Sequence, residues 1–116
     1  MTDIKAQLTS DRVTGQVVDH EIPGVGTIKI RGLSRHEMME SGRRFDGDPL
    51  AQERYILSRA IVEPVMGEHD VAAWQKGSVP GEINGVAKAV NALSGIGPDS
   101  AKEQYKSLRD EPIDGV

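Results

Sequence analysis

Apolar and polar positions alternate most clearly near the start of the chain. Apolar side chains within residues 17–22 precede the turn Pro23-Gly24-Val25-Gly26, and Ile28 and Ile30 alternate with basic residues after it. A period of two is typical of a half-buried strand, and proline with glycine supplies a turn. The pattern therefore predicts a β-hairpin between Thr14 and Gly32. An isolated hairpin is marginally stable in water, so its apolar face requires a covering layer.

A helix is expected directly after the hairpin. Ser34 and Glu37 have the spacing of a capping box, in which each side chain accepts a hydrogen bond from the other residue's backbone N–H. Leu33 and Met38 are placed for a hydrophobic staple around that cap. The helix is expected to end at Arg44 or Phe45.

A second helix is predicted to begin at Asp48, which caps it. Pro49 then occupies the first helical position, where its missing N–H costs nothing. The helix is predicted to continue to Glu63, because the residue before a proline avoids the helical region. Its apolar stripe consists of Leu50, Leu57 and Ile61.

Two further helices are predicted in the second half of the chain. Asp70 is expected to cap a short helix over 71–76, and Ser78 with Pro80 begins the next one. Gly95 is expected to end that helix. Its apolar positions recur at spacings of four and three residues and form a narrow seam: Val79, Ile83, Val86, Val90 and Leu93.

The length of the chain and these elements indicate one small domain. The chain has 116 residues, of which 37% are hydrophobic and only four are aromatic. A single domain is expected at this length. The predicted fold class is α+β, with an N-terminal β-hairpin packed on a small bundle of about four α-helices. We expect the domain to cover residues 13–97, between a polar arm at 1–12, flexible or briefly helical, and a polar, mobile tail at 98–116.

Charge and composition exclude several functional classes. Fourteen basic and eighteen acidic residues give a net charge of −4, whereas general nucleic-acid binders rely on basic patches. No apolar run approaches the roughly 18 residues that span a bilayer. The chain has no cysteine, and its polar start does not resemble a secretory signal. We therefore expect a cytoplasmic protein that binds neither nucleic acid nor membrane.

No motif for catalysis, cofactor binding or metal binding emerges. Gly24-Val-Gly26 lacks the third glycine and the following helix of a dinucleotide loop. His20 stands alone, and His36, Glu40 and His69 form a metal site only if the fold brings them together, as in a small metal-dependent hydrolase. Solvated side chains explain these residues better. The expectation is a protein that is not an enzyme and has no cofactor.

The candidate partner-binding residues are apolar side chains that could belong either to the core or to an interface. Trp74 is either the core plug of an aromatic-poor protein or a binding hot spot. Met39 points away from its neighbour Met38 on a helix, and methionine suits a partner groove. The helical seam either closes on the Leu50 stripe as core or forms a groove with it. We expect the hairpin face and the helix over 48–63 to form the core, with part of the seam left as interface. The candidates are therefore Trp74, Met39, Val79, Ile83, Val86 and Val90.

The order of segments resembles that of a known family. The string TIKIRGLSRHE at 27–37 is similar to the strand, Arg-Gly-Leu-Ser/Thr and helix opening of the tail assembly chaperones of long-tailed bacteriophages. Segments similar to those at 55–62, 68–74 and 90–96 follow in that family in the same order. The resemblance covers roughly residues 13–97.

This resemblance implies a non-enzymatic role during phage assembly. Such chaperones bind the tape-measure protein, a very long helical chain, and keep it soluble while tail-tube subunits polymerise around it. The family implies action in the cytoplasm of the bacterial host and absence from the mature virion. The major tail-tube protein and a second copy of the chain are further candidate partners. The alternative is a structural head–tail connector or tail-completion protein.

Overall fold

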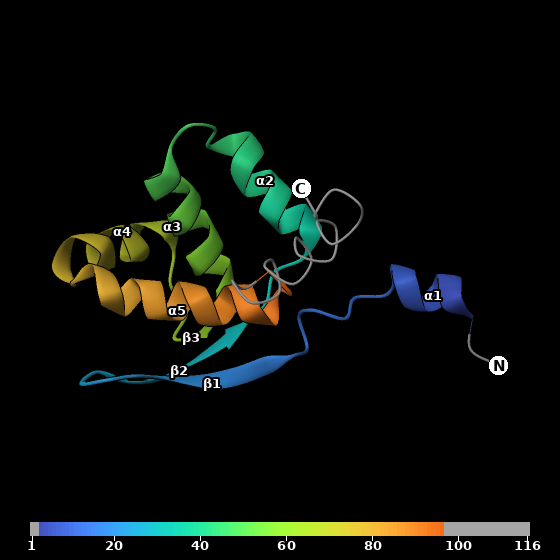
Figure 1. Ribbon diagram of the computed structural model, residues 1–116, viewed down its shortest axis with the longest axis horizontal. Helices are drawn as coiled ribbons and strands as arrows, with labels where there is room; N and C mark the ends of the chain where they lie inside the picture. The colour runs from blue at the N-terminus through green and yellow to red at the C-terminus, as the bar shows by residue number, and fades with distance from the viewer. Residues whose placement is uncertain (1–2, 97–116) are drawn as a thin grey trace, which may run out of the picture.

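The computed structural model describes residues 3–96, and the predicted tail at 98–116 lies outside them. The described part of the chain has the predicted α+β fold, with a three-stranded antiparallel sheet and five helices (Figure 1). The elements are α1 (Ile4–Thr9), β1 (Val17–Ile22), β2 (Gly26–Arg31), α2 (Arg35–Arg44), α3 (Pro49–Ala60), β3 (Ile61–Glu63), α4 (Glu68–Gly77) and α5 (Pro80–Leu93).

The predicted hairpin is formed by β1 and β2. Val17 lies opposite Arg31, and Ile22 lies opposite Gly26 at the turn. The turn uses positive φ angles of 80° at Gly24 and 145° at Gly26, which glycine adopts without steric cost. The hairpin is thus closed by local turn chemistry, and its apolar face is free to receive a helix.

The predicted second helix ends three residues early, which corrects the boundary drawn from the sequence. α3 ends at Ala60, and Ile61–Glu63 becomes β3, with Ile61 paired to Ile30 of β2. The β-branched side chains of Ile61 and Val62 favour an extended backbone, and Pro64 disfavours helix before it. Pairing with β2 then satisfies the backbone groups that the helix no longer uses.

The predicted caps at the starts of α2 and α3 are confirmed. The Ser34 hydroxyl accepts from the Glu37 N–H at 3.1 Å, and the Glu37 carboxylate accepts from the Ser34 N–H at 3.0 Å. The Asp48 carboxylate accepts from the Ala51 N–H at 3.1 Å at the start of α3. Both helices therefore begin where their first turns are satisfied locally.

Asp70 does not cap α4, contrary to the prediction. α4 begins at Glu68, three residues earlier than predicted, and the Asp70 carboxylate accepts from the Gly67 N–H at 2.9 Å. Asp70 thus stabilises the helix from inside its first turn rather than from the capping position. A carboxylate can accept a backbone hydrogen bond both from the N-cap position and from the third helical position. The sequence alone therefore did not show which of these two positions Asp70 occupies.

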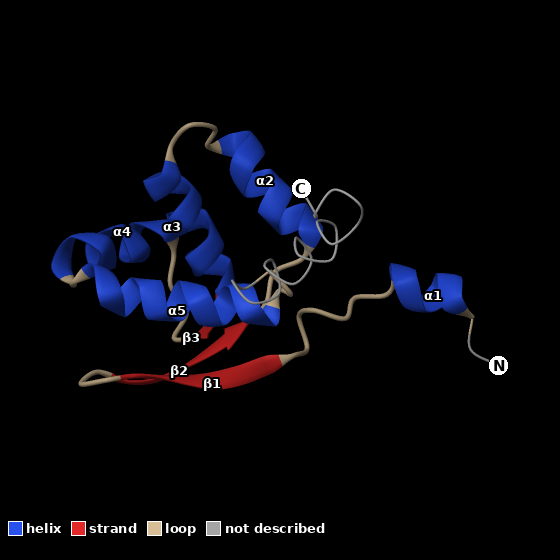
Figure 2. Cartoon of the chain, viewed as in Figure 1, coloured by secondary structure: helices blue, strands red, loops and turns tan. Residues whose placement is uncertain are grey.

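The core forms where α5 crosses the face of the hairpin and meets α3 and α4 (Figure 2). Parts of the predicted seam and of the predicted stripe meet there, whereas Val79, Leu93 and Leu50 remain outside the core. Trp74 and Met38 pack against its edge. The buried cluster contains Ile22, Ile28, Ile30, Leu33, Leu57, Ala60, Ile61, Val71, Ile83, Val86 and Val90.

The C-terminal end of α5 is fixed to the link between β2 and α2. A Cβ atom on Gly32 would lie 2.7 Å from the Leu93 carbonyl oxygen, so only glycine permits this approach. The Ser94 hydroxyl accepts from the Leu33 N–H at 2.8 Å and donates to the Val90 carbonyl oxygen at 2.8 Å. These contacts hold α5 in a defined position across the sheet.

Candidate functional site

A small groove remains open at the N-terminal ends of α3 and α5. Its volume is about 310 Å³, and α3, α4 and α5 all contribute to its walls. That volume is at the lower end of the range for ligand pockets. We call it the Leu50–Val79 groove, and its lining residues are Leu50, Glu53, Gln75, Ser78, Val79, Pro80, Ile83 and Asn84.

The two side chains that name the groove are unusually exposed for aliphatic residues. Leu50 is 59% exposed in the first turn of α3, and Val79 is 70% exposed at the start of α5. Ile83, one turn after Val79, is buried and also lines the groove. The core stripe therefore continues into solvent at this end of the molecule.

Val79 occupies the N-cap position of α5, where valine does not stabilise the helix. It is the N-cap of α5, with extended backbone and no side-chain hydrogen bond to the first turn. Ser, Thr, Asp and Asn are preferred there, and valine is among the poorest caps. An exposed valine at a capping position has neither burial nor capping to explain it, which favours a role in binding.

Polar contacts hold the α3 and α4 walls of the groove together. The Gln75 side-chain amide donates to Glu53 Oε1 at 2.9 Å and to the Leu50 carbonyl oxygen at 3.2 Å. Arg54 Nη1 donates to Gln75 Oε1 at 3.1 Å. Gln75 thus fixes the spacing of the two helices, and Glu53 places a carboxylate beside the apolar opening.

The six candidate residues from the sequence divide into separate groups. Val79 and Ile83 are brought together in the groove. Val86 and Val90 are fully buried in the core beneath α5, so their side chains present no surface to a partner in this structure. The two are core residues because the middle of the seam packs in the buried cluster, whereas Val79 at its start and Leu93 at its end are exposed.

Trp74 lies at the edge of the core rather than on a free surface. Its ring is half-buried against the buried cluster, and its indole Nε1 donates to Glu82 Oε1 at 2.8 Å. This bond satisfies the polar end of the indole and ties α4 to the first turn of α5. Trp74 is therefore a packing residue at the core edge and is not among the lining residues of the groove.

Met39 is exposed on a different element. Its side chain is 60% exposed on α2, which contributes no residue to the groove. Arg43, one turn later, pairs with Glu40. Met39 thus remains a surface candidate separate from the groove.

Leu50 is the groove residue that sequence reasoning misplaced. Its stripe with Leu57 and Ile61 predicted a place in the core, and both of those residues are indeed buried. Leu50 lies two residues after the Asp48 cap, so it projects from the very end of α3. Its position in the first turn was the feature of the sequence that could have indicated exposure, because the end of a helix can extend past the elements that cover the rest of it.

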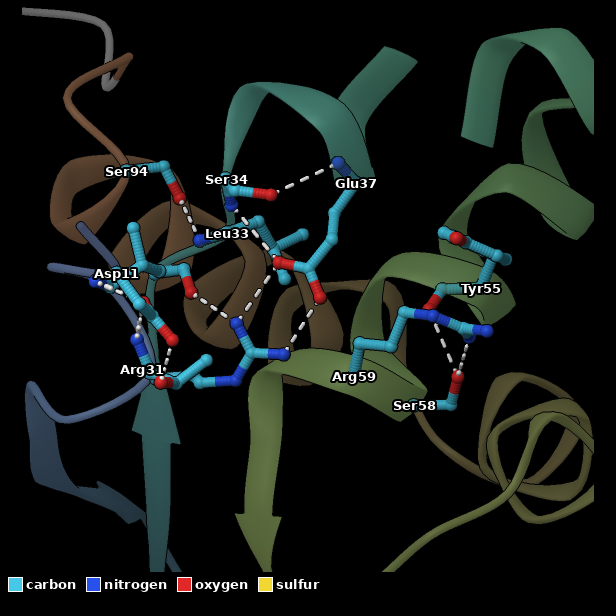
Figure 3. A network of polar contacts seen from close by, with 12 residues as sticks. Asp11, Arg31, Leu33, Ser34, Glu37, Tyr55, Ser58, Arg59 and Ser94 are labelled. Carbon is cyan, nitrogen blue, oxygen red and sulfur yellow. Dashed lines mark hydrogen bonds and ion pairs between the residues drawn. The ribbon is translucent and has the colours of Figure 1, made fainter. Parts of the chain in front are cut away.

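A cluster of charged and polar side chains lies away from the groove, at the start of α2 (Figure 3). Arg31 donates two hydrogen bonds to Glu37, with Nη1 at 3.0 Å from Oε1 and Nη2 at 2.8 Å from Oε2. These bonds hold the pKa of Glu37 below its ordinary value and raise the pKa of Arg31. Nearby, the Thr14 hydroxyl lowers the pKa of Asp11 to about 2 by hydrogen bonding. The cluster fixes the start of α2.

A second polar feature covers Tyr55 on the outer side of α3. The Arg59 guanidinium carbon lies 3.6 Å from the centre of the buried Tyr55 ring, and that of Arg44 lies 5.5 Å from it. Arg59 also approaches Glu68 at 3.9 Å. Figure 3 shows Arg59 folded over the tyrosine. These contacts account for the positions of both arginines as packing interactions.

The proposed metal ligands do not converge. Among residues 3–96, no group of three or more His, Cys, Asp or Glu side chains is arranged to hold a metal ion, so His36, Glu40 and His69 form no such site. Within the same range, no helix is both long and apolar enough to cross a membrane.

Comparison of the chain with models of protein families, with curated proteins and with solved structures finds no match.

Proposed function

We propose that this chain is a bacteriophage tail assembly chaperone that binds the tape-measure protein through the Leu50–Val79 groove. It keeps that client soluble while tail-tube subunits assemble around it. The proposal combines the family resemblance of segments 27–37, 55–62, 68–74 and 90–96 with the chemistry of the groove. Its main structural support is the exposed pair Leu50 and Val79 at the open end of an otherwise closed helix interface.

The groove suits an amphipathic helix as ligand. Recognition of a helix in a groove uses a few aliphatic anchors spaced along one face, with weak binding at each contact. A holding protein requires such an apolar surface and no catalytic group. The groove is small, so each copy would cover a short stretch of the client, and many copies would coat a long helical chain.

Co-expression with the tape-measure protein tests this proposal. The unmodified chain should keep the tape-measure protein in the soluble fraction. Val79→Asn should move most of it to the insoluble fraction, because an apolar anchor is lost without disturbing the core. Val65→Asn is the matched control, because Val65 is 90% exposed and does not line the groove. Equal solubility with and without this chain would overturn the proposal.

Analysis of purified particles separates the chaperone from the alternative structural role. A chaperone should be absent from finished virions, whereas a head–tail connector or tail-completion protein should be present at a fixed copy number. Mass spectrometry of purified particles, with a known tail protein as reference, distinguishes these outcomes.

A further inference from the structure

We propose that α1 of one molecule docks into the Leu50–Val79 groove of a second copy of this chain. The apolar face of α1 is exposed to solvent. Ile4 and Leu8 are 71% and 64% exposed, and no residue of this six-residue helix is buried. The two side chains are four residues apart and therefore share one face. A helix this short is not stable alone in water, so an apolar partner surface would stabilise it.

The receiving groove belongs to another molecule. α1 lies to one side of the body, at the end opposite the junction of α4 and α5 (Figure 1), and its Leu8 borders an open hollow against the start of α2. The linker from Ser10 to Gln16 has seven residues and reaches at most about 25 Å. In this arrangement the arm extends away from the groove of its own chain (Figure 1).

The charges beside the two apolar surfaces are complementary. Lys5 follows Ile4 and flanks the apolar face of α1. Glu53 lines the groove on the α3 wall, one turn after Leu50. With Ile4 and Leu8 in the groove, a basic side chain at the edge of α1 faces an acidic wall. Such complementarity selects the orientation of docking.

Docking of this kind joins molecules head to tail. Each copy would offer its arm to one neighbour and its groove to another, so the contact is heterologous and produces rings or open chains. The arm would also compete with a client helix for the same groove. The inference itself does not rest on the proposed function, because it concerns only copies of this chain.

Sedimentation velocity of the purified full-length chain at increasing concentration tests the proposal. The weight-average mass should exceed that of the monomer and increase with concentration. The double variant Ile4→Asp/Leu8→Asp and the single variant Val79→Asn should each sediment as monomers. Val65→Asn, altered outside the groove, should associate like the unmodified chain. None of these side chains belongs to the buried core, so each variant retains the fold.

Mixing the two defective variants provides the sharpest test. The first has an intact groove and no functional arm, and the second has an intact arm and no functional groove. Their equimolar mixture should form a one-to-one dimer and nothing larger. Lys5→Glu and Glu53→Lys should each weaken association, and the two together in one chain should restore it.

Three outcomes overturn this inference. They are a monomeric unmodified chain at every concentration, variants that associate as strongly as the unmodified chain, or a mixture that forms no dimer. No client is present in these experiments, so their failure leaves the tape-measure proposal standing. Conversely, the co-expression experiment can fail without affecting this inference. If the solubility of the tape-measure protein did not depend on this chain, the sedimentation masses of the chain alone would be unchanged.

Discussion

At the scale of single residues, Gly32 lies where β2 leads into α2, against the last turn of α5. Gly32→Ala places a methyl group 2.7 Å from the Leu93 carbonyl oxygen, which is backbone and cannot rotate away. We expect a loss of about 1–3 kcal/mol in the free energy of unfolding, the range for overpacking. Urea denaturation measures it.

Gly85→Ala is the matched control for Gly32→Ala. Gly85 lies within α5, and a Cβ atom there meets no other atom within 4 Å. Alanine should therefore stabilise the protein by about 0.5–1 kcal/mol through its better helix propensity. Glycine to alanine would then lower the free energy of unfolding at position 32 and raise it at position 85. Equal changes in the free energy of unfolding at the two sites would contradict the close approach at Gly32.

Glu37 gives the fold a dependence on pH. Hydrogen bonds from Arg31 lower its pKa in the folded state, so Glu37 contributes stability above its unfolded-state pKa of about 4.3. That contribution is lost as the pH falls through the lower folded-state pKa. Glu37→Gln should be less stable than the unmodified chain at pH 7 and should lose less stability between pH 5 and pH 3.

Denaturant titrations at several pH values measure this difference. Glu40→Gln serves as the control, because its partner Arg43 is largely exposed and such pairs contribute little. A Glu37→Gln variant whose stability changes with pH as steeply as that of the unmodified chain would show that Glu37 is not the responsible group.

At the scale of elements, α5 begins with a residue that does not cap it. Val79→Asn supplies an acceptor for the first-turn N–H groups, so we expect the free energy of unfolding to rise by about 1 kcal/mol. The same variant should lose both client binding and self-association. Thermal denaturation alongside the binding assays tests this, and Val79→Ala, which cannot cap, controls for the loss of the side chain.

The elements were largely predictable from the sequence, and their exceptions have physical reasons. The hairpin and the starts of α2 and α3 depend on a turn or a cap that lies within a few residues. The boundary between α3 and β3 depends on whether Ile61 finds a strand partner in Ile30, thirty-one residues earlier. Hydrophobic periodicity alone does not contain that information.

At the scale of the whole molecule, α1 lies to one side of the body and adds no residue to the buried core. Deleting residues 1–9 should leave the melting temperature unchanged, because α1 contributes no buried residue. The same deletion should abolish self-association. Thermal denaturation at low concentration, where the chain is monomeric, measures the first effect. A fall of several degrees would show that the arm packs on its own domain.

The candidate site was only partly predictable from the sequence, because the exposure of its residues depends on how the elements pack in the whole molecule. The sequence identified Val79 and Ile83 but grouped them with Val86 and Val90, because all four share one helical face. Which part of that face is covered depends on where α3 and the hairpin end relative to α5. Leu50 was placed in the core for the same reason.

The sequence by itself determined the features that depend on short-range chemistry: the glycine turn of the hairpin, the capping box of α2, the proline start of α3 and the α+β class. Each depends on residues within a few positions of one another. Only the tertiary structure decided that Ile61 extends the sheet, that Val86 and Val90 are core, and that Leu50 and Val79 border a groove. Burial is a property of surfaces that meet in space, and identical apolar stripes are covered or exposed according to the lengths of the elements packed against them.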